Sequence, residues 1–294
     1  MKKKSVITIG TFDGVHKGHK FLIDKTLSIA KRNNLKSIII ALEKPVKKVN
    51  GLLTSCQEKL EEISALGVDE IILIDVPSEI LTYTPDKFFD EFLVGDLNVS
   101  EVVCGLDFAF GKEREGDIFW LKKKTKDNTV KINVAKYLKC SSKQISSSYI
   151  RALIEKGDVK NAAKILGRPY SFSGIAFKGR GFGKKLGFPT VNLKVSNDKL
   201  LPKGVYISLI GQKDILCPSI TNIGSRVTFN ISENIVPETH ILNFNGTWKN
   251  ALTKVTLLKK LRDEKKFKDI QDLKNQIAKD RGKALKFFKF SKRV

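Results

Sequence analysis

The ten residues GTFDGVHKGH, at positions 10–19, follow the first apolar run of the chain, which spans 6–9. They hold two of the chain's three histidines, His16 and His19, among three glycines. In a doubly wound sheet, the turn between the first strand and the first helix is a preferred phosphate site, because backbone N–H groups point outward at the start of the helix. Residues three apart share one face of a helix, so both imidazoles can donate hydrogen bonds to a phosphate there. The turn therefore predicts a nucleotide-binding α/β domain, and the alternative is a pair of solvent-exposed or core histidines.

Other kinds of site do not fit this turn. It matches neither the dinucleotide-binding pattern GxGxxG nor the P-loop pattern GxxxxGK[ST]. A metal site would need a third ligand, and none is nearby in the sequence. The four cysteines are scattered and form no CxxC pair. We therefore expect reduced thiols, as in the cytoplasm, rather than a disulfide framework or a zinc site.

The composition indicates a folded protein with anionic partners. With 294 residues and 41% hydrophobic residues, the chain can bury a core in one large or two ordinary domains. No apolar run has the length of a membrane span, and the apolar stretch after the basic start is too short for a signal peptide. The formal net charge of +23 favours nucleic acids, phosphorylated metabolites or acidic membranes. Lysine is spread along the whole chain, however, which is equally consistent with a compositional habit of the source.

Short apolar runs alternate with amphipathic stretches in the first half of the chain, which predicts a parallel, doubly wound sheet. In the stretch 57–66 we expect Leu60 and Ile63 to point inward. The predicted strands are 6–9, 37–42, 71–74, 101–104 and 130–134, and the predicted helices are 20–32, 57–66, 85–93, 149–155 and 159–166.

From 170 to 258 the pattern changes to short runs separated by turn residues, with no convincing helix between them. This pattern is typical of a small antiparallel barrel. A helical pattern at 269–288 closes the chain. We place the domain boundary near Gly167, with an α/β domain over 1–166 and an all-β domain with a C-terminal helix over 167–294. The predicted barrel runs are 171–177, 204–211, 218–224, 227–232, 239–244 and 253–260.

Several motifs, taken in order, resemble one family. HxGH after a first strand is the signature of the nucleotidylyltransferase superfamily, and ISSSYIR at 145–151 resembles its second motif. The full run GTFDGVHKGH, with GLDFAFGKEREGD at 105–117, resembles the prokaryotic bifunctional riboflavin kinase/FMN adenylyltransferase family, commonly called FAD synthetase. The resemblance covers the chain from about residue 5 to past residue 280. The second half agrees through LGRPY (166–170), GRGFGKKLGFPTVNL (179–193), LPKGVY (201–206), TNIGSRVTF (221–229), ETHILNF (238–244) and LRDEKKF (261–267).

For residues 1–166 the resemblance implies transfer of AMP from ATP to FMN, which gives FAD and pyrophosphate. No covalent enzyme intermediate is needed, and the enzyme positions the substrates and stabilises charge at the α-phosphate. Asp107, Phe108 and Phe110 resemble the family's flavin-side loop, although the two phenylalanines equally suit an ordinary strand-end core. The implied ATP-binding residues are Gly10, Phe12, Asp13, His16, His19, Ser146, Ser147 and Arg151, of which His16, His19 and Arg151 are the implied catalytic residues.

For residues 167–294 the resemblance implies a six-stranded barrel that phosphorylates riboflavin at its 5′-hydroxyl. The glycine-rich stretch 177–187 would be a flap over ATP, with Lys178, Gly179 and Gly187 as its ATP-binding residues. The alternative for that stretch is a flexible hairpin turn.

The remaining kinase residues lie in the strands. Thr190 and Asn192 match the family's PTAN motif, which holds Mg²⁺ and phosphate oxygens, and hard oxygen ligands suit Mg²⁺. Glu238 matches the catalytic carboxylate, which would accept the proton of the attacking hydroxyl as general base. Arg262 matches a position near the flavin. His240 falls on the same strand face as Glu238, and we interpret it as structural.

The chain departs from the family pattern at three places. LEKPVKKV (42–49) stands where a Pro-His-Pro-like run is usual, RVTF (226–229) stands for RPTF, and NFNGTWKN (243–250) stands for DFxGDLYG. The last two touch the flavin side of the kinase site, so we expect kinase activity with an altered affinity for riboflavin.

Three functions are compared. The leading hypothesis is a bifunctional enzyme with riboflavin, FMN, FAD and ATP as partners and Mg²⁺ as cofactor. The alternatives are an adenylyltransferase whose weakened kinase barrel mainly binds flavin, and an RNA-binding protein that uses the positive charge. The chain contains no RNP-like motif. We therefore expect no specific nucleic acid and no membrane as partner, and we leave the oligomeric state open.

Overall fold

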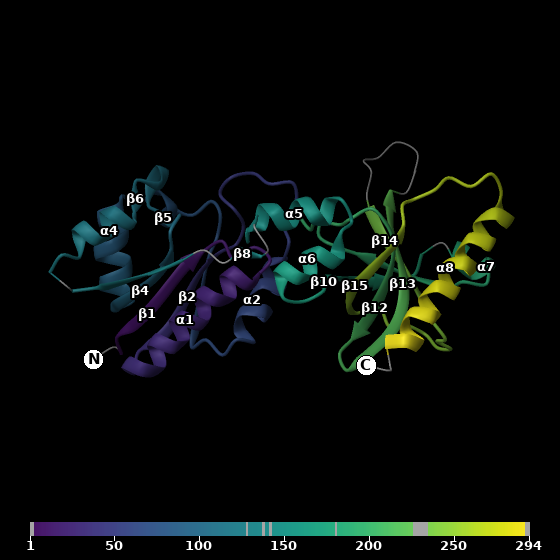
Figure 1. Ribbon diagram of the computed structural model, residues 1–294, viewed down its shortest axis with the longest axis horizontal. Coiled ribbons are helices and arrows are strands. Elements are labelled where there is room, and N and C mark those ends of the chain that lie inside the picture. Colours follow the sequence, from purple (N-terminus) through teal and green to yellow (C-terminus); the bar gives the residue numbers. More distant parts are fainter. Residues whose placement is uncertain are drawn as a thin grey trace. The chain divides into compact units, whose positions relative to one another are not determined.

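The computed structural model describes residues 3–127, 129–136, 139–140, 143–179, 181–225 and 235–291. The chain divides into two compact units, 1–147 and 148–294 (Figure 1). The RVTF motif at 226–229 and the predicted strand 227–232 lie outside the described residues.

The first unit is built on a five-stranded parallel sheet of order β3-β2-β1-β4-β7 (Figure 1). Strands β2 and β3 lie on one side of β1, and β4 and β7 lie on the other, so the strand order reverses between β1 and β4. Ligands of doubly wound sheets bind at such a switch point, beyond the carboxyl ends of the strands. The strands are β1 (Ser5–Gly10), β2 (Lys36–Leu42), β3 (Glu70–Ile74), β4 (Val99–Gly105) and β7 (Lys131–Ala135).

Helical segments cover both faces of this sheet. They are α1 (Lys17–Asn33), α2 (Cys56–Ser64), η1 (Glu79–Thr82), α3 (Pro85–Lys87), η2 (Phe88–Asp96), η3 (Lys112–Arg114) and α4 (Ile118–Lys124). Two small hairpins complete the unit, β5 (Ala109–Phe110) with β6 (Gly116–Asp117) and β8 (Lys139–Cys140) with β9 (Lys143–Gln144).

Neighbouring residues of β2 pack in different hydrophobic clusters, one on each face of the sheet. Ile40 packs in a cluster that contains Phe88 of η2. The preceding residue, Ile39, packs in another cluster with Ile23 of α1 and Ile63 of α2. A parallel sheet needs such cover on both sides because its strands are apolar on both faces. The predicted doubly wound domain is therefore confirmed.

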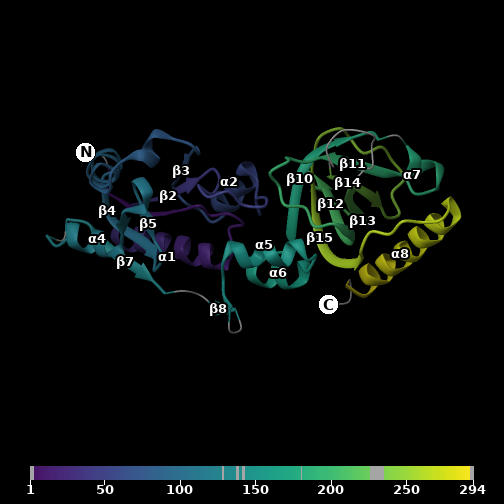
Figure 2. The ribbon, with the colours of Figure 1, turned by 90° about the horizontal axis from the view of Figure 1, so that it is seen from above.

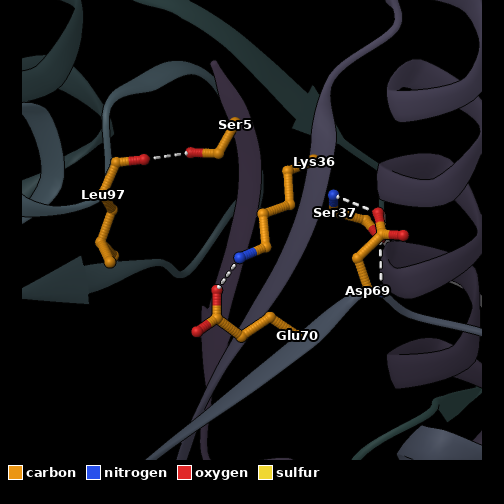
Figure 3. A network of polar contacts seen from close by, with 6 residues as sticks. All are labelled: Ser5, Lys36, Ser37, Asp69, Glu70 and Leu97. Atoms are coloured by element: carbon orange, nitrogen blue, oxygen red, sulfur yellow. Dashed lines mark hydrogen bonds and ion pairs between the residues drawn. The ribbon is translucent and has the colours of Figure 1, made fainter. Parts of the chain in front are cut away.

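Polar contacts tie the amino ends of these strands together at the edge opposite the switch-point loops (Figure 3). Asp69 accepts hydrogen bonds from the backbone N–H and the hydroxyl of Ser37, at 2.8 and 2.7 Å, and these bonds lower the pKa of Asp69. Lys36 Nζ lies 2.8 Å from a carboxylate oxygen of Glu70. None of these residues belongs to a predicted site, so we interpret the network as structural.

The second unit contains a closed antiparallel barrel of six strands in the order β10-β11-β14-β13-β12-β15, which confirms the predicted barrel. The last helix, α8, lies along the outside of the barrel (Figure 2), where its Ala284 packs in a cluster with Val205 and Ile220. The strands are β10 (Tyr170–Phe177), β11 (Thr190–Lys194), β12 (Gly204–Gln212), β13 (Ile215–Ser225), β14 (Ile235–Ile241) and β15 (Leu252–Arg262), and the helices are α5 (Ser147–Glu155), α6 (Val159–Leu166), α7 (Phe182–Lys185) and α8 (Ile270–Ser291).

Several elements differ from the sequence predictions. Helix α1 begins at Lys17, three residues earlier than predicted, because His16 caps it. The predicted helix 85–93 is one α-helical turn followed by the π-helix η2. In α2, Leu60 is half-buried, whereas Lys59 is buried beside Ile63. Strand β11 and the helical turn α7 were not predicted, and neither were α4 and the hairpin β5–β6.

The division by contacts falls earlier than the predicted boundary at 166/167, because α6 packs against β10 and β15. The boundary between the two functional domains stays a prediction.

Candidate active sites

His16 and His19 lie face to face at the start of α1. Their rings are stacked with centroids 3.6 Å apart and planes inclined by 14°. His16 is the N-cap residue, and its Nδ1 accepts a hydrogen bond from the backbone N–H of His19 at 3.2 Å. A ring nitrogen that accepts carries no proton, so the neutral His16 ring bears its proton on Nε2 and can donate from there. The turn thus presents one donor of known tautomer beside a second imidazole.

The second imidazole, that of His19, is uncharged at neutral pH. Burial lowers the pKa of His19 well below its usual value, and the neighbouring His16 and Lys59 lower it further. The Nδ1 atom of His19 is buried and has no hydrogen-bond partner among the described residues. A buried polar atom without a partner costs free energy. This atom therefore points to a ligand at the start of α1.

Two buried residues of the turn, Phe12 and Asp13, contact the His19 ring and the neighbouring loop. Phe12 is fully buried, and its ring meets the edge of the His19 ring at a centroid distance of 5.2 Å. Asp13 is also buried, and its Oδ1 accepts hydrogen bonds from the backbone N–H groups of Leu53 and Thr54, at 2.9 and 3.1 Å. Contact of these two residues with ATP stays a prediction.

The second predicted motif meets this turn at one residue. Ser147 Oγ donates a hydrogen bond to the carbonyl oxygen of Asp13 at 2.8 Å. Ser146 is half-buried just before α5, and Arg151 is half-buried one helical turn beyond Ser147. Gly10 is the last residue of β1, at the carboxyl edge of the sheet. Contact of these residues with ATP stays a prediction.

The predicted flavin loop follows β4 at the same edge of the sheet. Its three predicted residues differ in how deeply they are buried. Phe110 is buried, with ring centroids 5.4 Å from Phe88 and 5.5 Å from Trp120. Phe108 is half-buried and stacks on Phe110 at 5.5 Å, while Asp107 is exposed. Phe110 thus fits the alternative reading, a strand-end core, and Phe108 is the aromatic ring with a partly free face.

A pocket of about 310 Å³ lies between barrel strands, the flap and α8. Three predicted kinase residues, Thr190, Glu238 and Arg262, are among its lining residues. The opposite side of β14 is packed: Thr239 is fully buried, and its hydroxyl is hydrogen-bonded to that of Thr221 at 2.9 Å. The alternation of β14 therefore turns Glu238 toward the pocket.

The pairing of β14 with β11 and β13 brings polar residues together beside this pocket. Glu238 pairs with Asn192 of β11 on one side and with Asn222 of β13 on the other. Thr190 pairs with His240 in the neighbouring register position. Asn222 also lines the pocket, and the sequence analysis did not single it out. It belongs to the TNIG stretch of the family resemblance, which was the available signal.

His240 has the contacts of a structural residue. Its Nδ1 is hydrogen-bonded to the carbonyl oxygen of Pro189 at 2.9 Å, and its ring meets the edge of the Phe188 ring at 5.6 Å. Burial lowers the pKa of His240. The neutral ring therefore holds the segment that leads into β11.

Part of the flap forms a rim of the pocket. Phe182, Gly183 and Leu186 line it. Lys178 is exposed, and Gly187 has a φ of +87° with open space where a Cβ would stand. Contact of Lys178, Gly179 and Gly187 with ATP stays a prediction.

The two predicted magnesium ligands differ in position: Thr190 lines the pocket, whereas Asn192 is buried and pairs with Glu238 in the strand register. Thr190 and Asn192 offer side-chain oxygens, and Mg²⁺ is usually bound by one or two protein groups together with substrate phosphates. Two glycines are in close contact with these residues: a Cβ on Gly179 would overlap the Asn192 amide, and one on Gly183 would lie 2.5 Å from the carbonyl oxygen of Phe188 and 3.2 Å from Thr190 Oγ1. Across the part of the chain that the structure describes, no group of three or more His, Cys, Asp or Glu residues forms a cation cage.

Arg262 ties the barrel to α8. Its Nε donates to Asp280 Oδ2 at 2.8 Å, and both side chains are largely buried. The other carboxylate oxygen of Asp280 accepts from Gln276 at 2.9 Å. Arg262 also stands 5.8 Å from the centroid of the Phe267 ring. It therefore shapes the pocket wall, and its contact with flavin stays a prediction.

The segment NFNGTWKN (243–250), which departs from the family pattern, follows β14. Two of its aromatic side chains pack against each other. The rings of Phe244 and Trp248 meet edge to face at 5.7 Å, and the Trp248 indole N–H donates to Thr253 Oγ1 at 3.3 Å. Neither ring is among the lining residues of the pocket. The expected change in riboflavin affinity stays a prediction.

The parallel sheet with its histidine turn and the barrel with its polar pocket define a nucleotidylyltransferase-type domain followed by a kinase-type barrel domain. Residues 1–149 match the FAD synthetase family and residues 166–288 match the riboflavin kinase family. The chain belongs to the family of bifunctional riboflavin kinase/FMN adenylyltransferases.

Similar proteins cover nearly the whole chain. The bifunctional riboflavin kinase/FMN adenylyltransferase of Bacillus subtilis (strain 168) is 32% identical, over 97% of this chain and 93% of its own. That of Escherichia coli (strain K12) is 31% identical, over 98% and 94%. A crystal structure described as a macrolide-efflux protein from Streptococcus pneumoniae is similar with a TM-score of 0.85 and 26% identity, over 95% of this chain and 93% of that one. Within the described ranges of this chain, no helix is both long and apolar enough to cross a membrane.

Proposed function

We propose that this chain phosphorylates riboflavin to FMN with ATP and then transfers AMP from a second ATP to FMN, giving FAD and pyrophosphate. The observation that carries the proposal is the stacked histidine pair at the start of α1, whose buried His19 Nδ1 lacks a partner at the switch point of the sheet. The polar wall around Glu238 supports the kinase half. Both reactions use soluble substrates, and we place them in the cytoplasm.

In the adenylyl transfer, a phosphate oxygen of FMN attacks the α-phosphorus of ATP and the bond to pyrophosphate breaks. Negative charge is redistributed over the phosphate oxygens, so the protein's part is to supply donors fixed in advance. The His16 Nε2–H and the free backbone N–H groups at the start of α1 are such donors. Phe12 and Asp13 hold the turn so that these groups do not reorganise during the reaction.

In the phosphorylation, the 5′-hydroxyl oxygen of riboflavin attacks the γ-phosphorus of ATP. Glu238 accepts the hydroxyl proton as the new bond forms. Thr190 and Asn192 would hold Mg²⁺ together with the phosphates, and the ion would neutralise part of their charge. The tie between Arg262 and Asp280 keeps α8 in place as a wall of the site.

The kinase half is tested with Glu238→Gln. The protein is incubated with riboflavin, ATP and Mg²⁺, and the flavins are separated by chromatography. Gln keeps the size of the side chain and loses the proton acceptor, so FMN formation should fall by roughly 10²–10⁴-fold. FAD formation from supplied FMN should stay near normal. A Gln variant within a few-fold of the parent, or one that also loses FAD formation, contradicts the assignment.

The adenylyltransferase half is tested in the same assay with His16→Ala and His19→Ala. Each variant should lose FAD formation while FMN accumulates from riboflavin, because the kinase residues are untouched. Equal loss of both products in a folded variant would argue against two separate sites.

A further inference from the structure

Lys59, in the first turns of α2, is a buried lysine at the carboxyl edge of the parallel sheet. It is 1% exposed, and its Nζ donates hydrogen bonds to the backbone carbonyls of Leu42 and Glu43, where β2 ends. Lysine is almost never fully buried unless its charge is compensated. Ser55 caps α2 with a capping box, which fixes the helix so that position 59 faces the sheet. The burial of this charge therefore needs an explanation.

Acidic groups around Lys59 compensate its charge. Burial lowers the pKa of Lys59, whereas Asp13, Cys56 and Glu43 act in the opposite direction and favour the charged form. Asp13 belongs to the histidine turn, and its hydrogen bonds also hold the loop before α2. Lys59 thus joins α2 to the end of β2, and Asp13 joins the loop before α2 to the histidine turn.

The same cation acts on the histidine pair. The charged and titratable groups that act on His19 are His16, from its own turn, and Lys59, from α2. A fixed positive charge disfavours a second positive charge close by. The His19 ring, whose Nδ1 has no hydrogen-bond partner among the described residues, is therefore kept neutral until an anion arrives.

We propose that Lys59 is a positioning residue of the adenylyl-transfer site: its buried ammonium group holds α2 against the end of β2, next to the loop that Asp13 of the histidine turn binds, and presents a fixed positive charge to His19. The consequence for catalysis rests on the proposed function of this turn. A triphosphate that binds at the start of α1 brings negative charge to the pair and offsets the effect of Lys59. Arrival of the phosphates is then coupled to the proton state of His19.

The test is an NMR titration of the histidine ring protons in the full chain without substrates, which is practical because the chain has three histidines. Lys59→Gln keeps an N–H donor and removes the charge, and Lys59→Arg keeps the charge. Lys25→Met is a matched control, because Lys25 also donates from a helix to a strand-end carbonyl, that of Val134 at 3.3 Å. The titration midpoint of His19 should move to higher pH in Lys59→Gln and stay in place in the other two variants.

The pH profile of FAD formation gives a second readout. The kcat/KM profile reports the ionisations of the free enzyme. Its inflection from His19 should move to higher pH in Lys59→Gln, and Lys59→Arg should restore the parent profile. A purely structural role would lower the rate at every pH without moving the inflection, and that result overturns the proposal.

The titration distinguishes failure of the Lys59 proposal from failure of the proposed function. A folded Lys59→Gln variant whose His19 titrates as in the parent overturns the proposal. If that variant does not fold, the same titration is made with Lys59→Met, which also removes the charge: a His19 midpoint at higher pH supports the proposal, and a parental midpoint overturns it. A parent protein that forms no FAD would refute the proposed function alone, because the titration needs no substrate.

Discussion

At the scale of single residues, the histidine turn depends on one glycine as much as on its imidazoles. A Cβ at position 18 would lie 3.1 Å from Cε1 and 3.2 Å from Nδ1 of His16. That Nδ1 accepts the hydrogen bond which fixes the His16 tautomer. A side chain at position 18 would therefore move the ring and disturb the donor on Nε2.

Gly18→Ala should lower FAD formation by less than about 10²-fold, because the contacts require a smaller shift of His16 than the ~1 Å displacement that costs that much. FMN formation from riboflavin should not change, because position 18 belongs to the first unit and is not among the lining residues of the barrel pocket. The control is Gly282→Ala in α8, where no atom lies within 4 Å of the added Cβ. Both products are quantified by chromatography. A Gly18→Ala enzyme with parental FAD formation would contradict the positioning of His16 by this glycine.

The sequence predicted which residue types meet at each site but not how deeply each lies. His16 and His19 were found because histidine is rare in this chain and both fall in one turn. For Phe110 the sequence left a flavin loop and a strand-end core open, and the structure places it in an aromatic core with Phe88 and Trp120. Lys59 was missed because a lysine on an amphipathic helix normally lies on the solvated face. Such outcomes are set by tertiary contacts, which a single sequence pattern does not contain.

At the scale of elements, the C-terminal helix is held by a buried ion pair rather than by apolar packing alone. Arg262 ends β15, and its partner Asp280 lies on α8, with 14% and 3% of their side chains exposed. Removing one partner of a buried pair leaves an uncompensated charge, which costs more than the pair contributes. The position of α8 against the pocket should therefore depend on Asp280.

Asp280→Ala should destabilise the second unit by roughly 3–5 kcal/mol. It should also weaken riboflavin binding, because Leu273, Ile277 and Asp280 are the α8 residues that line the pocket. Thermal denaturation and the quenching of riboflavin fluorescence measure the two effects. The control is Asp263→Ala, which removes the exposed partner of Lys260 and should change little. Equal melting temperatures for parent and Asp280→Ala would show that α8 does not need this pair.

Elements whose apolar residues recur with a regular period were predicted from the sequence. Elements whose conformation depends on tertiary contacts were not. The parallel strands and α1, α2, α6 and α8 follow from apolar spacing along the chain. The π-helix η2 does not, because an apolar run of this length does not distinguish π from α geometry. Strand β11 and the turn α7 lie in a glycine-rich stretch whose conformation is set by contacts with the barrel, such as those of Gly179 and Gly183.

At the scale of the whole molecule, two domains with separate chemistry share one strongly positive chain. The motif order along the sequence predicted both domains, because each motif has a defined place on its fold. The net charge of +23 belongs to neither site, since the lysines are spread over all parts of the chain. Its physical effect is therefore expected in weak, general attraction to anions.

Nucleic acid should bind this protein without sequence preference and without effect on flavin chemistry. Lysines that contact phosphates release condensed counterions, so the logarithm of the binding constant should fall linearly with the logarithm of the salt concentration. Non-specific dissociation constants of this kind are about 10⁻⁴–10⁻⁶ M at physiological salt. Fluorescence anisotropy with RNA oligomers of unrelated sequence, measured across a salt series, gives the slope and the preference. FAD formation measured with and without nuclease treatment should be equal, because nucleic acid is not a substrate of either proposed reaction. Tight binding of one sequence at physiological salt, or loss of activity on nuclease treatment, would mean that the charge serves a specific nucleic-acid partner.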